Sequence, residues 1–397
     1  MPLMQAKIND ILSSRTKEEI EATLDYFDAL PLRIMRKNEL VRTLASYLSA
    51  PKVWLDKLME QDLRLLQTLC KAGPDNSVDM IPGDYPSVVE VLRFVDTSRP
   101  GSGDDMQRLS IPAVFYELIA KDIDEVISRK EKDGSFDLEH LILGAVNIYG
   151  IVPLRTFVDC IFDDIDDLSA AHEFAMNVAR HPVIRLYQEE YKGEAYLVSP
   201  YVENFEETMK LRRERYKQIR KYAKANHDEA ERCGVNAPFC CYGLDTAEGK
   251  ALVDMLSYLG YEGDALDAAA HSVWLNAQYE PDSRNLDMLM SPLSSAADDV
   301  DTLDRFAEFA QIVLDYANSV PKWLLKGHTA KETGLMTYTV TDAYLEEIYG
   351  AELSESENEE VMRFFDSVHK VRPVAPDDPC PCGSGLSYRL CHGKLYS

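Results

Sequence analysis

Apolar residues recur with a helical period from the beginning of the chain. Thr16 followed three residues later by Glu19 is a capping-box signal, and the apolar stripe that follows it ends before Pro31. After the extended segment LRIMRK, a second apolar stripe lies between Asn38 and Leu48. The pattern predicts a helix, an extended linker and a second helix within residues 1–50.

Residues 136–202 combine helical and strand patterns. LEHLILGAVNIY and VPLRTFVDCIF are typical of two helices separated near Gly150, and a third helix is expected near Ser169 to Arg180. VIRLYQEE and AYLVSP then predict two strands around the turn YKGE, and three helices followed by a hairpin is the order of a winged helix. Residues 137–200 carry eleven acidic and four basic residues. This balance favours a packing or protein-contact role over docking in a DNA groove.

The remaining segments complete a mainly α, multi-domain organisation. Turn-rich stretches interrupt the helical pattern up to residue 135, and three amphipathic stretches after residue 245 predict a helical bundle. RPVAPDDP is typical of an extended tether. The predicted parts are a helical module 1–50, a helical region with long loops 51–135, a winged-helix-like module 136–202, a basic helix with a helical bundle 203–340, an acidic and Pro-rich linker 341–376 and a small tail 377–397.

The overall charge is strongly acidic, with 68 Asp and Glu against 42 Lys and Arg in 397 residues and a net charge of -26. Such a surface repels polyphosphate, so a contact with nucleic acid requires a local basic patch. The first basic stretch contains Arg33, Arg36, Lys37 and Arg42. The second, predicted as a partly exposed helix over 210–224, contains Arg212, Arg213, Arg215, Lys217, Arg220 and Lys221. Each stretch is either a solvated face that pairs with acidic groups of the same chain, or a contact for RNA, the ribosome or an acidic protein.

Motifs of catalysis and of membrane insertion are missing from the sequence. It contains no HExxH, GxSxG, P-loop or GxGxxG pattern, which favours a non-catalytic protein. No apolar run is long enough to span a membrane, so we expect a cytoplasmic protein. His328 is interpreted as a cap or turn residue, and the acidic run 163–167 as a solvated face.

Five cysteines lie upstream of the tail. Most are in or beside apolar stretches, where buried and inert thiols are expected, although the last three could instead form a second metal site. They are Cys70, Cys160, Cys233, Cys240 and Cys241.

The tail concentrates four metal-binding side chains in thirteen residues. Cys380 and Cys382 are followed, after eight residues, by Cys391 and His392. Three thiolates and an imidazole make a complete tetrahedral set for Zn²⁺, with no position left for a substrate. Because so short a segment cannot bury an apolar core, we expect it to fold only when the metal binds.

The stretch CPCGSGLSYRLCHG closely resembles the SEC-C motif, a zinc-binding module named for the C-terminus of the translocase motor SecA. The resemblance implies the same four zinc ligands, and it implies docking to an acidic chaperone or to the ribosome. Leu386 and Ser387 stand where relatives usually carry lysines, which weakens the expected contact with the acidic chaperone.

A second resemblance covers the first basic stretch. LPLRIMRKNELVRTLASYL resembles SAP-like or Rho N-terminal-like modules, some of which bind nucleic acid. With the phrases VNIYGIVP and PKWLLKGHT, the chain resembles a group of largely uncharacterised SEC-C-containing bacterial proteins. The sequence therefore predicts a zinc-binding interaction or adaptor protein that docks a protein or ribosomal partner. The alternative is a nucleic-acid-associated regulator that uses the stretches 33–42 and 210–224.

Overall fold

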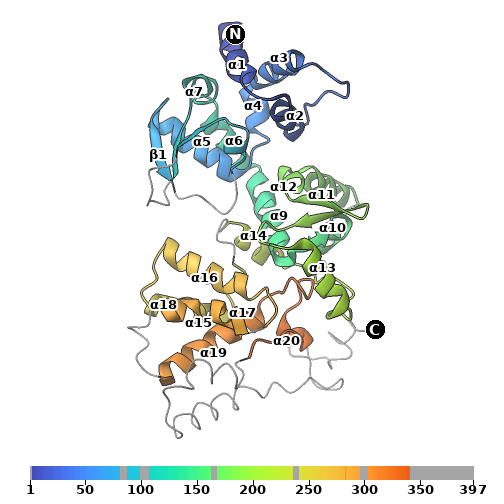
Figure 1. Ribbon diagram of the computed structural model, residues 1–397, viewed down its shortest axis with the longest axis vertical. Coiled ribbons are helices and arrows are strands. Elements are labelled where there is room, and N and C mark those ends of the chain that lie inside the picture. The colour runs from blue at the N-terminus through green and yellow to red at the C-terminus, as the bar shows by residue number, and fades with distance from the viewer. Residues whose placement is uncertain are drawn as a thin grey trace. The chain divides into compact units, whose positions relative to one another are not determined.

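The computed structural model describes residues 2–80, 87–98, 107–161, 168–235, 241–281, 283–295 and 303–339 (Figure 1). Helices dominate these residues, and the mainly α class is confirmed. None of the described helices is both long and apolar enough to cross a membrane. The chain divides into two compact units, the first formed by residues 1–140 and 176–186, the second by residues 141–175 and those from 187 onward.

The first unit is helical with one small sheet. Its elements are α1 (Pro2–Ser13), α2 (Lys17–Tyr26), α3 (Lys37–Leu48), α4 (Pro51–Leu55), α5 (Glu60–Ala72), β1 (Ser77–Met80), α6 (Val88–Val91), β2 (Asp96–Ser98), β3 (Gln107–Ser110), α7 (Ala113–Ile119), α8 (Ile123–Lys132) and α12 (Pro182–Leu186). The strands are antiparallel in the order β1-β3-β2. The sequence did not predict this sheet, because its strands are only three or four residues long and β2 is exposed throughout.

One hydrophobic core joins the predicted parts 1–50 and 51–135. The capping box of α2 is present, with the Thr16 hydroxyl 3.1 Å from the Glu19 amide nitrogen and the Glu19 carboxylate 2.8 Å from the Thr16 amide nitrogen. Trp54 packs on Phe94 with ring centroids 5.2 Å apart, and Phe94 packs on Phe115 at 5.1 Å. All three rings are buried in the same cluster as the helix α2 stripe. These two parts therefore fold together around shared aromatic residues.

The second unit combines a three-stranded sheet with a helical bundle. Its elements are β4 (Ile151–Pro153), α10 (Leu154–Ile161), β5 (Gln188–Tyr191), β6 (Glu194–Val198), α13 (Phe205–Glu214), α14 (His227–Val235), α15 (Ala247–Tyr258), α16 (Asp264–Asn276), α17 (Ser283–Leu289), α18 (Ser291–Ser295), α19 (Leu303–Ser319) and α20 (Ala330–Thr333). Two further helices, α9 (Ser135–Tyr149) and α11 (Leu168–Arg180), contribute residues to both units.

The predicted hairpin around YKGE is confirmed. Tyr191 pairs with Glu194, and the two residues between them, Lys192 and Gly193, have φ of 53° and 78°. Two positive φ values are the signature of a type I′ turn, which suits the twist of a two-residue hairpin. Two details of the prediction were wrong. The letters VIRL belong to helix α12 rather than to a strand, and the chain before helix α10 forms strand β4, which pairs with β6 and completes the sheet in the order β4-β6-β5.

The predicted helical bundle is confirmed as α15, α16 and α19, which pack around one apolar cluster (Figure 1). Trp274 and Tyr316 are almost completely buried in it. Helices α9 and α14 approach closely at Gly144, where an added Cβ would lie 1.7 Å from the carbonyl oxygen of Ala230. A side chain of any size at Gly144 is therefore incompatible with this packing.

Candidate functional site

The second basic stretch is not one continuous helix. Helix α13 ends at Glu214, and the chain is irregular from Arg215 to Asn226, so the predicted helix over 210–224 was wrong. The reason is packing, because Tyr216 and Ile219 are buried in a small cluster with Leu324, Leu325 and Met336. Burial of these two side chains holds the stretch against the segment around residue 324.

Arg212, which was predicted as a nucleic-acid or partner contact, is buried. Its guanidinium donates to the carbonyl oxygens of Trp323 at 2.9 Å, Ile151 at 2.7 Å and Tyr149 at 2.9 Å, and to the Tyr222 hydroxyl at 3.1 Å. Desolvation by burial lowers the pKa of Arg212. Arg212 thus ties α13 to the strand β4 region and to the segment around Trp323.

The other predicted residues of this stretch are exposed: Arg213, Arg215, Lys217, Arg220 and Lys221. Arg215 forms an ion pair with Glu280 at 2.5 Å, and the Tyr216 hydroxyl lies 3.0 Å from the same carboxylate. Pairing with acidic groups of the same chain, one of the two interpretations of this stretch, therefore holds for Arg215.

Several of these basic side chains converge on one cavity of about 480 Å³, which we call the basic cavity. It is lined by Pro153, Tyr196, Met209, Arg212, Arg213, Lys217, Ile219, Arg220, Tyr222 and Lys326. No carboxylate occurs among these ten residues. One lining residue contacts an acidic group: the Glu194 carboxylate accepts a hydrogen bond of 2.8 Å from the Tyr196 hydroxyl.

Lys326 is the basic lining residue that the sequence did not predict. Its ammonium lies 5.4 Å from the centre of the Tyr222 ring and 3.3 Å from the Arg220 carbonyl oxygen. Burial and the charge of Arg212 lower the pKa of Lys326. Lys326 belongs to the phrase PKWLLKGHT, and nothing in that phrase indicates that it folds beside residues 213–222.

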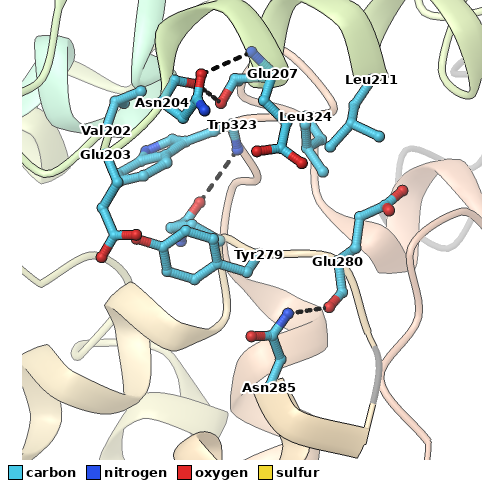
Figure 2. A pocket seen from close by; sticks show the side chains of 12 residues that line it. Val202, Glu203, Asn204, Glu207, Leu211, Tyr279, Glu280, Asn285, Trp323 and Leu324 are labelled. Carbon is cyan, nitrogen blue, oxygen red and sulfur yellow. Dashed lines mark hydrogen bonds between the residues drawn. The ribbon is translucent and has the colours of Figure 1, made fainter.

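An acidic cavity of about 240 Å³ lies at the other end of α13 (Figure 2). Glu203, Glu207 and Glu280 surround it, together with the rings of Tyr279 and Trp323. Burial and the charge of Glu203 raise the pKa of Tyr279 to about 12. The distribution of charge along α13 matches the helix dipole, because this helix has acidic residues in its first turn and basic residues in its last.

His328 and three of the upstream cysteines occupy buried positions. His328 is buried directly after a turn, and its ring nitrogen lies 3.3 Å from the Lys221 carbonyl oxygen. The Cys241 sulfur is 2.9 Å from the Tyr316 hydroxyl, and Cys160 and Cys233 are buried. Burial raises the pKa of Cys160 to about 11, which disfavours the reactive thiolate form. Among the described residues, no group of three or more His, Cys, Asp or Glu is placed to hold a metal ion. Cys240 and the acidic run 163–167 lie outside the described residues.

The first basic stretch lies in the other unit. Arg33, Arg36 and Arg42 are exposed, and the Lys37 ammonium donates to the Ser13 carbonyl oxygen at 2.9 Å. Leu32 and Ile34, in the extended linker that the sequence predicted, are exposed to 108% and 98%.

The four predicted zinc ligands, Cys380, Cys382, Cys391 and His392, lie outside the described residues. Residues 378–394 match the family model described as the SEC-C motif. No solved structure matches the chain. The matched segment includes all four predicted ligands, so the chain carries a SEC-C motif at this position.

Proposed function

We propose that this chain is a zinc-binding interaction protein whose SEC-C motif docks a protein or ribosomal partner. The observation that carries the proposal is the match of residues 378–394, a short module with its ligands complete, at the end of a body of two helical units. We place the protein in the cytoplasm, where thiols stay reduced and available to metal.

The donor set fits zinc. Three thiolates and one imidazole are the ligands of closed, structural zinc sites, and Cys380, Cys382, Cys391 and His392 would hold the ion. When bound, zinc would supply folding free energy to the motif rather than a reactive group. Arg389 and Lys394 remain as basic residues that an acidic partner could contact.

The body would serve as a second interaction element. We propose a winged-helix-like module within residues 136–202, supported by the order α9, β4, α10, α11, β5, β6 and by the antiparallel sheet. Its excess of acidic residues favours a protein partner. The helix, linker and helix of residues 17–48 support a SAP-like or Rho N-terminal-like module at the start of the chain.

A pull-down tests the docking function. The intact chain and the variant Cys380→Ser/Cys382→Ser are used as baits, with Cys70→Ser/Cys160→Ser as a matched control that removes two thiols from the body. We expect about one zinc per intact chain by elemental analysis, loss of zinc in the first variant only, and loss of the same set of partners. An unchanged partner set in the zinc-free variant would refute docking through the motif.

Association with nucleic acid is the second candidate function. Exposed Arg33, Arg36 and Arg42 in one unit, and exposed Arg213, Lys217 and Arg220 in the other, support it. Binding to single-stranded RNA or duplex DNA should then fall steeply as salt is raised from about 50 to about 200 mM. If no binding to either nucleic acid is detected near about 50 mM salt, this function is refuted.

A further inference from the structure

We propose that the basic cavity binds a phosphate group carried by a small ligand. Cations from two distant parts of the chain face this one hollow: Arg213 at the end of α13 with Lys217 and Arg220 after it, and Lys326 from the segment before α20. The proposal is independent of the SEC-C motif, since no lining residue belongs to residues 378–394.

The cavity lacks an internal counter-charge. Arg212, in its wall, donates to carbonyl oxygens, to the Tyr222 hydroxyl and to the Met209 sulfur, and it has no carboxylate partner among the described residues. Lys326 likewise approaches a carbonyl oxygen and an aromatic ring rather than an acid. Bringing several like charges together without an anion costs free energy, and a bound dianion would remove that cost.

Several basic groups elsewhere in the chain pair with acidic side chains. Arg64 pairs with Glu60 at 2.9 Å, Lys331 pairs with Glu248 at 3.2 Å, and Arg232 pairs with Asp245 at 2.8 Å. In a chain with a net charge of -26, acidic partners are abundant. An anionic ligand would supply the counter-charge that the lining of the basic cavity lacks.

The surroundings favour a compact anion over a polymer. Glu194 borders the cavity, and Glu189 stands opposite Tyr196 in the β5–β6 ladder, on the same face of the sheet. These carboxylates would repel an extended polyphosphate that leaves the cavity, whereas a single phosphate group inside it would meet a lining with four exposed or partly exposed cations and no carboxylate. A volume of about 480 Å³ lies in the range of small-ligand pockets.

The experiment is calorimetric titration of the full chain at low salt with three probes: inorganic phosphate, a nucleoside monophosphate, and a single-stranded RNA of about twelve nucleotides. The test variant is Lys217→Gln/Arg220→Gln, which removes two exposed lining charges. The matched control is Lys210→Gln/Lys221→Gln, which removes two exposed charges of the same stretch that do not line the cavity.

We expect phosphate or the monophosphate to bind, with the Kd raised at least tenfold in the test variant and less than twofold in the control. Tighter binding of the monophosphate than of inorganic phosphate would identify a nucleotide-like ligand, and equal binding would identify the phosphate group alone. Binding of RNA without either small probe would overturn the proposal in favour of a polymer. Equal losses in the two variants, or no binding of any probe at millimolar concentration, would overturn it as well.

Discussion

Arg212 offers the sharpest test of how the second unit is held together. Replacing it with methionine keeps an unbranched chain of similar length but removes every donor. The carbonyl of Ile151 keeps a partner, because the Tyr222 hydroxyl lies 3.2 Å from it. The Trp323 carbonyl also keeps a partner, because it accepts from the Lys326 amide at 3.1 Å, whereas the Tyr149 carbonyl loses the donor that Arg212 provides at 2.9 Å.

Leaving a buried acceptor without its partner costs about 1–3 kcal/mol. One such acceptor gives about 1–3 kcal/mol, the other lost hydrogen bonds of Arg212 add to this, and removal of the desolvated guanidinium returns part of it, since burying a charge is itself unfavourable. We therefore expect Arg212→Met to lower the free energy of unfolding of the second unit by about 2 kcal/mol.

The assay is urea denaturation followed by tryptophan fluorescence, with hydrogen exchange measured by mass spectrometry to assign the loss to peptides of the second unit. The control is Arg213→Met, because Arg213 is the exposed neighbour on the same helix. We expect this control to change the free energy of unfolding by less than about 0.5 kcal/mol. A loss below about 1 kcal/mol for Arg212→Met, or equal losses for both variants, would refute the reasoning.

Three further predictions follow from packing, titration and metal. Gly144→Ala should lower the free energy of unfolding by more than about 3 kcal/mol, or prevent folding, because the new Cβ would lie 1.7 Å from the Ala230 carbonyl oxygen. Gly193→Ala, where no atom lies within 4 Å of the new Cβ, should cost about 1 kcal/mol because of the positive φ. Similar melting temperatures for the two variants would contradict this prediction. Burial raises the pKa of Glu139 to about 7, so the folded first unit holds a proton that the unfolded chain releases near pH 4.5. The stability of that unit should therefore fall by up to about 3 kcal/mol between pH 5 and 8, and Glu139→Gln should flatten the profile in urea titrations; an unchanged slope would disprove the assignment. Chelation should remove the zinc and increase hydrogen exchange within residues 378–394 while leaving the melting of the two units unchanged, and a large loss of helix signal would contradict that separation.

Local signals predicted most of the helices correctly. Helix α2 has a reciprocal cap between Thr16 and Glu19, and α15, α16 and α19 have broad apolar faces, so their sequence patterns match their packing. Gly193 marks the hairpin because a type I′ turn needs positive φ. The sheet of β1, β2 and β3 was missed, since three or four residues are too few to show an alternating pattern.

The candidate site was less accessible to sequence reasoning. Arg212 and Arg213 are adjacent and chemically identical, yet one is buried and the other exposed, and only the packing of α13 decides between them. Lys326 is more than a hundred residues from the stretch that it joins. Charge clustering in sequence therefore located the basic cavity but could not identify its complete lining.

The division of the chain has a practical consequence for dissecting it. Residues 176–186 return to the first unit after residues 141–175 have entered the second. No single cut in the chain can therefore leave both units whole on separate fragments, and a fragment ending at residue 140 would lack α12. To express one unit without residues of the other, the intervening segment must be replaced by a short linker. This linker would join residue 140 to residue 176 in the first unit, and residue 175 to residue 187 in the second.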